Sequence, residues 1–398
     1  MMTVILFIFI LGLLVFVHEF GHFIVARKSG MKVYEFGFGF PPRACGFYKD
    51  LKTGKIVWVK KKDKELRKKE KESTLANTVG GEEREEEYSA TVYSINWLPL
   101  GGFVKIKGEN GEKASEPDSF GYHKFWKKAL VLVAGVTMNF LLAVVLLSVG
   151  FMIGLPADAE SMTDPKAIVV EEPFVTAQQI EEGSPADLAG ILFGDKILFV
   201  DGVQIVDASQ LVSLVNERAN QDVTVDIERV GERVSLSMTP VQLEGENTAR
   251  LGISVVETGK IRYPWYLAIY RGFIGAVITT IHIFLAFVVL IKNLILGQGL
   301  AFDVSGPVGI AVIVGESARL GLAYLINITA MLSLSLAVIN ILPIPALDGG
   351  RLLFVTIEKI FKRPIPLKYE QIAHTVGFVL LMALIVVVTW RDVAGLFE

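Results

Sequence analysis

Residues 3–26, TVILFIFILGLLVFVHEFGHFIVA, form an apolar run that carries two histidines and a glutamate near its end. The run is long enough to cross about 30 Å of hydrocarbon as a helix, where ionisable side chains are costly unless coordinated or hydrogen-bonded. His18 and His22, spaced four apart, share one helix face and can both reach a zinc ion, while Glu19 can activate a bound water. The spacing predicts a metal site in a membrane helix; a polar helix contact or a proton path is the alternative.

The composition requires lipid around part of the chain. Its 398 residues are 52% hydrophobic with a mean hydropathy of +0.49, which is too apolar for an ordinary soluble enzyme. No Lys or Arg precedes the first apolar run, so we expect it to remain as a helix rather than be cleaved as a signal peptide. The sequence predicts an α-helical integral membrane protein with about four transmembrane helices, at residues 1–27, 129–154, 320–350 and 373–390.

The distribution of charge predicts the orientation. Arg27 and Lys28 directly follow the first helix, so the positive-inside rule places its C-terminal end in the cytoplasm. Residues 27–128 carry 22 Lys and Arg against 15 Asp and Glu, whereas residues 155–262 carry 8 against 19. We therefore expect the first of these segments inside the cell, the second outside, and the basic connector 351–372 inside. The net charge of −3 gives no indication of nucleic-acid binding, and a single cysteine excludes an intramolecular disulfide.

Residues 165–256 have the pattern of a small soluble domain, with short β-type runs, Gly and Asp-Gly turns and one helical run at 207–219. An ordered series of short motifs resembles the bacterial PDZ domain: Gly183-Ser184-Pro185-Ala186, Ala189-Gly190-Ile191, Gly194-Asp195-Lys196-Ile197 and Val200-Asp201-Gly202. The resemblance implies an inserted, extracytoplasmic α+β PDZ domain that binds peptide termini as an added strand at a sheet edge. The alternative is that these residues make the turns of another small α+β domain.

Residues 28–128 are predicted to form a cytoplasmic, membrane-associated β-loop with a charged insertion. The segments 33–40, 55–59 and 89–107 alternate or cluster aromatic and β-branched residues as strands do. The blocks 60–72 and 82–87 are charged, which predicts a solvated helix pair or a disordered insertion without chemistry of its own.

A catalytic zinc normally has three protein ligands, so a third is needed. The remaining histidines lie in no comparable motif: His123, His282 and His374. The stretch from Asn340 to Gly350, NILPIPALDGG, ends a transmembrane run in Asp348, which two prolines would hold on non-helical backbone. Taken alone, Asp-Gly-Gly predicts a simple turn equally well.

The two motifs together resemble the site-2 protease family of intramembrane zinc metalloproteases. The resemblance extends through GVTMNF at 135–140, LPLGG at 98–102 and GPVGI at 306–310, and it covers nearly the whole chain. With a PDZ domain between spans, the chain is most similar to the bacterial RseP-like branch. It departs from some members in having one PDZ domain in place of a tandem pair, and its charged insertion is unusual.

The resemblance implies the roles of individual residues. Zinc would be held by His18, His22 and Asp348, with Glu19 as base and acid. The residues implied to bind substrate are Asn139, Asn340, Pro343 and Pro345. The substrates would be single-pass membrane proteins, such as anti-sigma factors or remnant signal peptides, cut within their transmembrane segments in regulated intramembrane proteolysis at the bacterial plasma membrane. The β-loop would hold the unwound substrate as an added strand.

The apolar stretch 265–296 conflicts with this ligand set if it spans the membrane. Both ligand motifs lie at C-terminal ends of helices, so both helices must run from outside to inside for the ligands to meet. A crossing by 265–296 would place Asp348 on the wrong face. We therefore expect residues 263–319 to lie along the membrane or dip into it, a position with which Arg271, His282 and Lys292 are compatible.

Two other classes of function remain as hypotheses. One is a non-enzymatic PDZ membrane scaffold with a decayed metal site, against which the complete set of His18, Glu19, His22 and Asp348 argues. The other is a zinc or proton transporter, which needs a polar path through several spans. The sequence shows only one such cluster at one depth.

Overall fold

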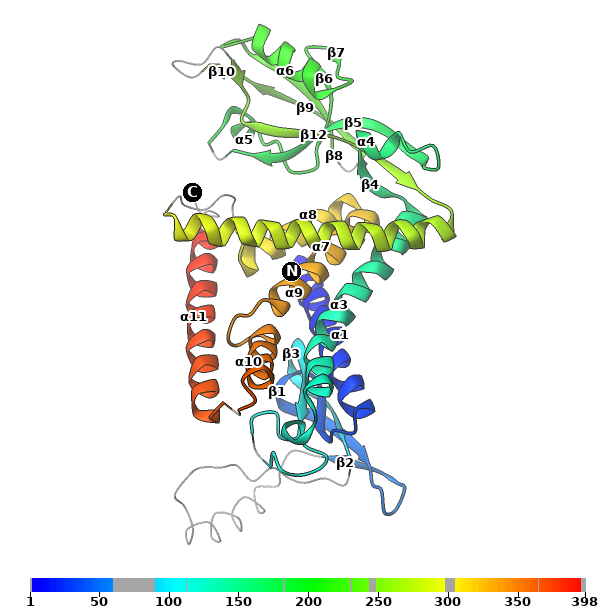
Figure 1. Cartoon of the computed structure of the whole chain (residues 1–398). Coiled ribbons are helices and arrows are strands. Elements are labelled where there is room, and N and C mark those ends of the chain that lie inside the picture. The colour runs from blue at the N-terminus through cyan, green and yellow to red at the C-terminus, as the bar shows by residue number, and fades with distance from the viewer. Residues whose placement is uncertain are drawn as a thin grey trace. The chain divides into compact units, whose positions relative to one another are not determined.

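The computed structural model (Figure 1) describes residues 2–59, 90–111, 113–181, 183–229, 231–242, 248–297, 305–363 and 365–394. The charged blocks 60–72 and 82–87 lie outside the described residues. The chain divides into two compact units. The first comprises Met1–Leu142, Thr280–Gly309 and Leu332–Glu398, and the second comprises Ala143–Thr279 and Ile310–Met331.

Five helices of the described chain are long and apolar enough to cross a membrane: α1 (Met2–Lys28), α3 (Phe125–Ile153), α7 (Trp265–Ile295), α9 (Leu322–Ile341) and α11 (Leu367–Ala394). Four of them correspond to the predicted spans, and the fifth is α7. The apolar 18-residue window of α7 has a mean hydropathy of 2.6, the same as that of α3, so apolarity does not separate α7 from the other helices. The number of spans therefore stays a prediction.

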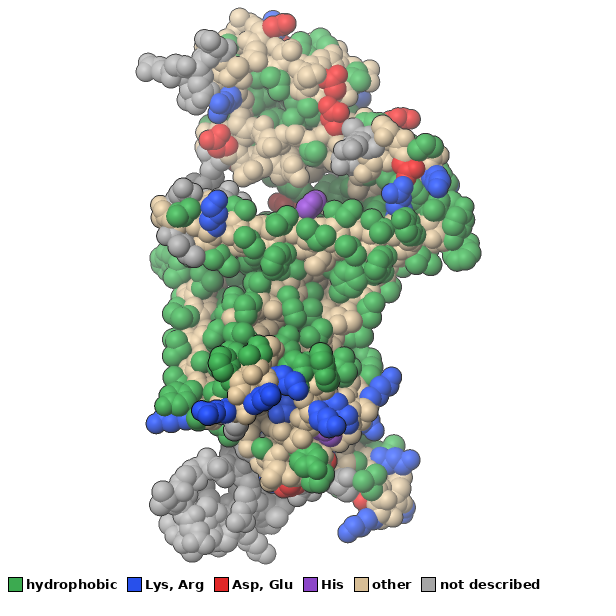
Figure 2. Space-filling model, viewed as in Figure 1, with side chains coloured by type: hydrophobic (Ala, Val, Ile, Leu, Met, Phe, Trp, Pro, Cys, Tyr) green, Lys and Arg blue, Asp and Glu red, His purple; other side chains and the backbone are tan. Residues whose placement is uncertain are grey.

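The surface of these helices is suited to lipid. The described part of α11 has no buried residue, and large apolar side chains such as Phe378, Leu380 and Val387 are more than half exposed. Figure 2 shows hydrophobic side chains over the helices of the first unit and Lys and Arg gathered at one end of it. An exposed apolar surface of this kind marks a region covered by lipid or by another protein.

The predicted helix at 320–350 is two helices. Helix α9 ends at Ile341, residues 342–347 are not helical, and α10 (Asp348–Phe361) begins at the aspartate itself. The prolines at 343 and 345 explain the break, because proline has no backbone N–H and disfavours helical backbone in the residue before it. A shorter helix, α8 (Pro307–Leu320), precedes α9.

A sheet lies between α1 and α3 in the chain. Its strands are β1 (Val33–Lys49), β2 (Ile56–Val59) and β3 (Val92–Ile106), in the order β2-β1-β3. Glu35 of β1 pairs with both Val92 and Lys105 of β3, so this part of β1 lies between the two halves of β3. The second half of β3, from Gly102 onward, is therefore a sheet edge among the described strands. Strands occur where alternation predicted them; their position at a membrane surface stays a prediction.

Aromatic packing holds this sheet against α1. Phe16, Phe20 and Phe23 of α1 surround Phe36 of β1, with ring centroids 4.7 to 6.1 Å from that of Phe36. Burying such a side chain contributes about 1.5–3 kcal/mol. The edge half of β3 also lies close to α1. Gly101, directly before this half, has no room for a side chain, because a Cβ there would meet Val15 of α1 at 2.8 Å. This packing brings the sheet edge beside the predicted metal motif.

The second unit contains a small α+β domain. Its main sheet has the strand order β4-β12-β5-β6-β8-β9, with β7 paired to β6. The strands are β4 (Leu155–Asp158), β5 (Ile168–Ile180), β6 (Lys196–Val200), β7 (Val203–Gln204), β8 (Val223–Arg229), β9 (Glu232–Met238) and β12 (Ile253–Arg262). Short elements complete the described chain: η1 (Phe120–Tyr122), α4 (Ala159–Met162), α5 (Pro185–Leu188), α6 (Ala208–Glu217), β10 (Val241–Gln242) and β11 (Ala249–Arg250). Short strands occur within residues 165–256, α6 lies within the predicted helical run 207–219, and the sheet extends beyond residues 165–256 at both ends.

Arg271 of α7 is paired within the second unit. It forms an ion pair with Asp164, which also accepts a hydrogen bond from the Tyr263 hydroxyl at 3.1 Å. The backbone N–H of Tyr263 donates to the carbonyl of Phe151 at 2.8 Å and so joins the start of α7 to the end of α3. The charge of Arg271 is thus balanced where α7 begins.

Candidate metal centre

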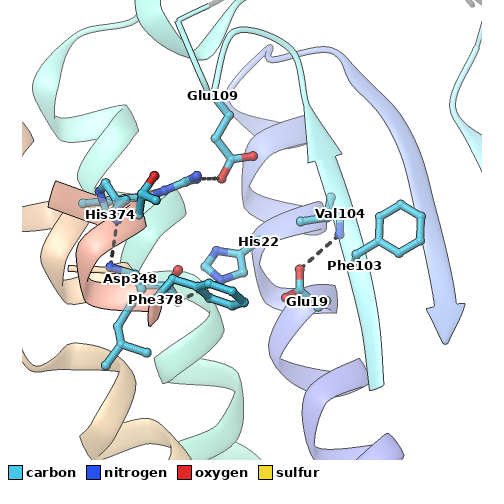
Figure 3. A pocket seen from close by; sticks show the side chains of 12 residues that line it. Glu19, His22, Phe103, Val104, Glu109, Asp348, His374 and Phe378 are labelled. Carbon is cyan, nitrogen blue, oxygen red and sulfur yellow. Dashed lines mark hydrogen bonds and ion pairs between the residues drawn. The ribbon is translucent and has the colours of Figure 1, made fainter. Parts of the chain in front are cut away.

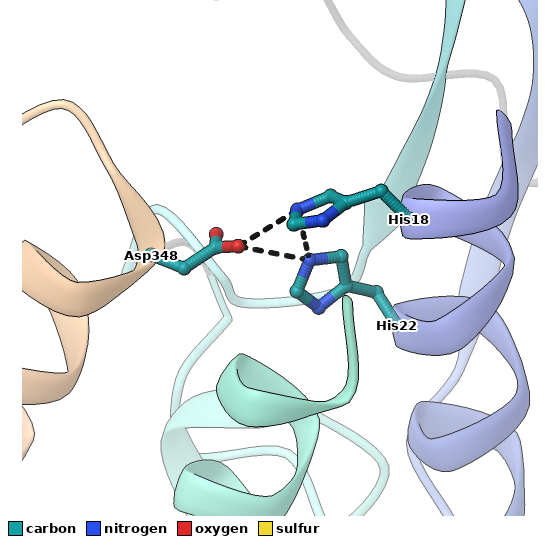
Figure 4. A group of neighbouring side chains, drawn as sticks. All are labelled: His18, His22 and Asp348. Atoms are coloured by element: carbon teal, nitrogen blue, oxygen red, sulfur yellow. Dashed lines mark hydrogen bonds and ion pairs between the residues drawn. The ribbon is translucent and has the colours of Figure 1, made fainter. Parts of the chain in front are cut away.

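Three side chains from distant parts of the chain meet in the first unit. Asp348 Oδ2 lies 2.9 Å from His18 Nε2 and 3.2 Å from His22 Nε2, and the two Nε2 atoms are 3.2 Å apart (Figure 4). Their ligand atoms form a group that could hold a metal ion. The structure thus brings together the three residues that the sequence motifs single out.

Helix α3 orients one of the two histidines. The side chains of His18 and His22 are 9% and 8% exposed and lie one turn apart on α1. His22 Nδ1 donates a hydrogen bond to the carbonyl of Val131 on α3 at 2.7 Å. A proton on Nδ1 leaves the lone pair of Nε2 free, and this tautomer is the one that binds a metal through Nε2.

Two glycines allow α1 and α3 to approach this closely. A Cβ at Gly135 of α3 would lie 2.5 Å from His22 Nε2 and 2.6 Å from His18 Cε1. A Cβ at Gly21 of α1 would lie 2.4 Å from the carbonyl oxygen of Ala134. The sequence motif that begins at Gly135 therefore leaves room for both imidazoles, a role that sequence reasoning did not assign to it.

The loop before Asp348 is held by close backbone packing. A Cβ at Gly349 would lie 2.2 Å from the carbonyl oxygen of Leu342, and one at Gly350 would lie 2.3 Å from that of Ile344. The loop thus folds back so closely over the start of α10 that the two positions after Asp348 have no room for a side chain. A simple turn would not require glycine at both positions.

His374 of α11 fixes the same loop from the other side. Ala346 has φ +80°, a left-handed conformation that is rare for residues other than glycine. Its N–H donates to His374 Nδ1 at 2.8 Å. Sequence reasoning left His374 without a motif, because no local signal shows that its ring reaches a loop 28 residues earlier.

The donor set fits zinc. Zinc bonds to nitrogen and oxygen are about 2.0–2.2 Å, so two ligands of a tetrahedral site lie about 3.3 Å apart. The three distances of 2.9 to 3.2 Å are close to this separation. Two imidazoles and a carboxylate leave a fourth position for water.

A cavity of about 480 Å³ adjoins the cluster (Figure 3). Its lining includes Glu19, His22, Phe103, Val104, Glu109, Asp348, Arg351, His374 and Phe378. Glu19 Oε2 accepts a hydrogen bond at 3.1 Å from the N–H of Val104, on the edge half of β3. An ion pair between Glu109 and Arg351 joins the loop after β3 to α10. Glu19 therefore shares one cavity with two of the clustered side chains.

The residues implied to bind substrate lie differently. Asn139 is fully buried and does not line this cavity; its Nδ2 is 3.4 Å from His18 Nδ1. The Asn139 side chain has no exposed surface in this structure, and its contact with substrate stays a prediction. Asn340, Pro343 and Pro345 are also absent from the cavity lining, and their roles stay predictions.

Comparison with known proteins gives the family. The profile of peptidase family M50 matches residues 6–57 and 83–384. The regulator of sigma-W protease RasP of Bacillus subtilis is 30% identical over 99% of each chain, and the zinc metalloprotease RasP of Bacillus licheniformis is 31% identical over 100% of each. The crystal structure of the PDZ domain of an SdrC-like protein from Listeria innocua covers 21% of this chain and 92% of its own, at 19% identity and a TM-score of 0.19. The chain belongs to peptidase family M50, and it is a zinc metalloprotease of the site-2 protease type.

Proposed function

We propose that this chain is an intramembrane endopeptidase that holds zinc through His18, His22 and Asp348 and uses Glu19 as its base. The observation that carries the proposal is the meeting of the three ligand atoms beside a cavity that Glu19 also lines. The substrates are transmembrane segments of single-pass proteins, of the anti-sigma factor or remnant signal peptide type. The Bacillus subtilis relative is named a regulator of sigma-W protease, which supports this class.

The chain's residues divide the reaction between them. Zinc held by His18, His22 and Asp348 would polarise the scissile carbonyl and would lower the pKa of a bound water towards about 7. Glu19 takes a proton from the attacking water and passes it to the departing amine nitrogen. General acid–base catalysis of this kind contributes about 10²–10⁴-fold in rate. Val131, through its carbonyl, keeps the His22 ring in the metal-binding tautomer.

The edge of β3 supplies a surface for an unwound substrate. Peptide bonds in a helix are already hydrogen-bonded, so the substrate must unwind before it is attacked. An extended segment can then pair with the sheet edge at residues 102–106, as peptides add to other sheet edges. Because the Val104 N–H on this edge is bonded to Glu19, the edge lies directly beside the proposed base.

The rest of the chain selects and admits substrates. The predicted PDZ domain acts as a docking site for peptide termini or as a size filter. We place it and the N-terminus outside the bacterial plasma membrane, with the zinc site towards the cytoplasm, on the distribution of Lys and Arg around the apolar helices.

The substitution Glu19→Gln tests the proposal. The amide keeps the size of the carboxylate but cannot accept the proton, so zinc should be retained while cleavage falls by about 10²–10⁴-fold or more. Elemental analysis and cleavage of a model transmembrane substrate measure the two properties on one sample. Near-normal turnover with zinc bound would refute the role of Glu19. Proteomics of membrane fragments that accumulate in cells expressing the variant would name the substrates.

A further inference from the structure

Asn139 has an unusual environment for an amide side chain. It lies on α3 one turn after Gly135 and has no exposed surface. Its Nδ2 atom is 3.4 Å from His18 Nδ1, and its Oδ1 atom is buried without a hydrogen-bond partner. Buried polar atoms are nearly always paired, so an unpaired oxygen here needs an explanation.

The tautomer of His18 provides one. His18 Nε2 points at Asp348 and His22, and it can bind zinc only through its lone pair. The proton of the neutral ring must then lie on Nδ1, where it faces the NH₂ group of Asn139, and two donors cannot pair. Turning the amide by 180° exchanges its oxygen and nitrogen with almost no change in shape. The oxygen then accepts the Nδ1 proton.

The number of hydrogen bonds favours the turned orientation of the Asn139 amide. With the proton on His18 Nδ1, the first orientation of Asn139 leaves Oδ1 unpaired and places Nδ2 against another donor. The second orientation pairs Oδ1 with the ring N–H. An amide that gains a bond in a buried site is favoured over one that gains none.

We propose that Asn139 is a positioning residue for His18. Its amide oxygen accepts the hydrogen bond from Nδ1 and holds the imidazole in the tautomer that presents Nε2 to zinc. The proposal rests on the proposed zinc site and replaces the substrate contact that the sequence suggested. It also accounts for the burial of Asn139, which a substrate contact does not.

The second histidine is held in a parallel way. Val131, Gly135 and Asn139 are spaced four residues apart and so share one face of α3. The carbonyl of Val131 accepts from His22 Nδ1, Asn139 accepts from His18, and Gly135 leaves space for both rings. One helix face thus supplies one acceptor to each histidine. The backbone carbonyl of Asn139 in turn accepts from the Ser333 hydroxyl at 2.8 Å, which ties α3 to α9.

Zinc affinity of the full chain in detergent, measured by competition with a chelator and without substrate, tests the proposal. Loss of an outer hydrogen bond to a metal-binding histidine typically weakens metal binding about 10–100-fold, and we expect this for Asn139→Ala. Asn139→Asp should retain the affinity of the natural chain, because a carboxylate offers the acceptor and needs no donor. Thr137→Ala is the matched control, since Thr137 is exposed on the same helix and its hydroxyl donates to the carbonyl of Val133, away from the histidines.

Two results would overturn the proposal. One is an Asn139→Ala chain whose zinc affinity lies within about threefold of that of the Thr137→Ala control. This change is much smaller than the loss expected when a hydrogen bond to a metal-binding histidine is removed. The other is an Asn139→Asp chain that has lost affinity about tenfold or more, which would show that the amide N–H was needed. The aspartate variant is nearly isosteric and decides the question even where the alanine variant fails to fold. If instead His18→Ala holds as much zinc as the natural chain, the assignment of the zinc site fails, and this outcome is distinct from the other two.

Discussion

Replacing Gly135 by alanine puts the packing of α3 against the two histidines to a direct test. The added methyl carbon would lie 2.5 Å from His22 Nε2 and 2.6 and 2.7 Å from His18 Cε1 and Nε2. Ordinary contact between such atoms is about 3.5 Å, so both rings must retreat by about 1 Å or the helices must separate. Both rings are buried, and His18 lies between Asp348, His22 and Asn139.

The magnitude follows from the tolerance of a metal site. Functional side chains must be held within about 0.5 Å of their productive positions, and the required shift is about twice that. A change at one outer contact costs about 10–100-fold in metal affinity, and this substitution disturbs two ligands together. We therefore expect zinc binding to weaken by at least about 100-fold, or about 2.7 kcal/mol, with proteolysis lost in parallel.

The assay is chelator competition on the purified full chain, followed by cleavage of a model transmembrane substrate. Gly275→Ala in α7 is the matched control, because a Cβ there would meet its nearest atom at an ordinary 3.8 Å. Thermal unfolding without zinc separates a local effect from general overpacking, which costs about 1–3 kcal/mol. If Gly135→Ala keeps zinc affinity and cleavage within about threefold of the control, α3 does not shape the site as described.

Three further expectations follow. Asp348→Ala should weaken zinc retention and abolish cleavage while the protein still inserts, as elemental analysis and membrane fractionation would show, because the apolar spans do not depend on that carboxylate. His374→Phe removes the hydrogen-bond acceptor for the N–H of Ala346. Cleavage and zinc occupancy should both fall, and unchanged values would mean that the loop before Asp348 is held without His374. The orientation can be tested with single cysteines in a chain that lacks the native cysteine. A membrane-impermeant thiol reagent should label a cysteine that replaces Gly202 from outside, and should fail to label one that replaces Gly350 until the cytoplasmic face is opened. Labelling of intact cells at position 350 would contradict the proposed orientation.

Much of this arrangement could be predicted because its signals are local. Apolar length predicted α1, α3, α9 and α11, and short β-type runs between turns predicted the strands of the small α+β domain. The four-residue spacing predicted that His18 and His22 share a helix face. Asp348 needed the family resemblance as well, since Asp-Gly-Gly on its own is equally a turn.

The remaining features depend on contacts that leave no local trace. Gly135, Asn139 and His374 act on residues 28 to 121 positions away, and their importance appears only when the helices are packed. Asn139 shows this most clearly. A polar residue in a membrane helix predicts a functional role, but whether it faces a substrate or a neighbouring histidine is decided by the rotation of α3. Hydropathy likewise could not decide how many helices cross the membrane.

The metal cluster constrains that number. His22 lies near the C-terminal end of α1, and Asp348 lies seven residues beyond the C-terminal end of α9, yet their side chains are 3.2 Å apart. If two membrane-spanning helices carry ligands of the same metal ion at their C-terminal ends, both helices must cross the membrane in the same direction. Since α3 returns the chain once, a second return by α7 would reverse α9 and carry Asp348 to the opposite surface. We therefore keep the proposal that α7 lies along the membrane or dips into it, which the meeting of His22 and Asp348 supports, although the apolar windows of α3 and α7 share a mean hydropathy of 2.6.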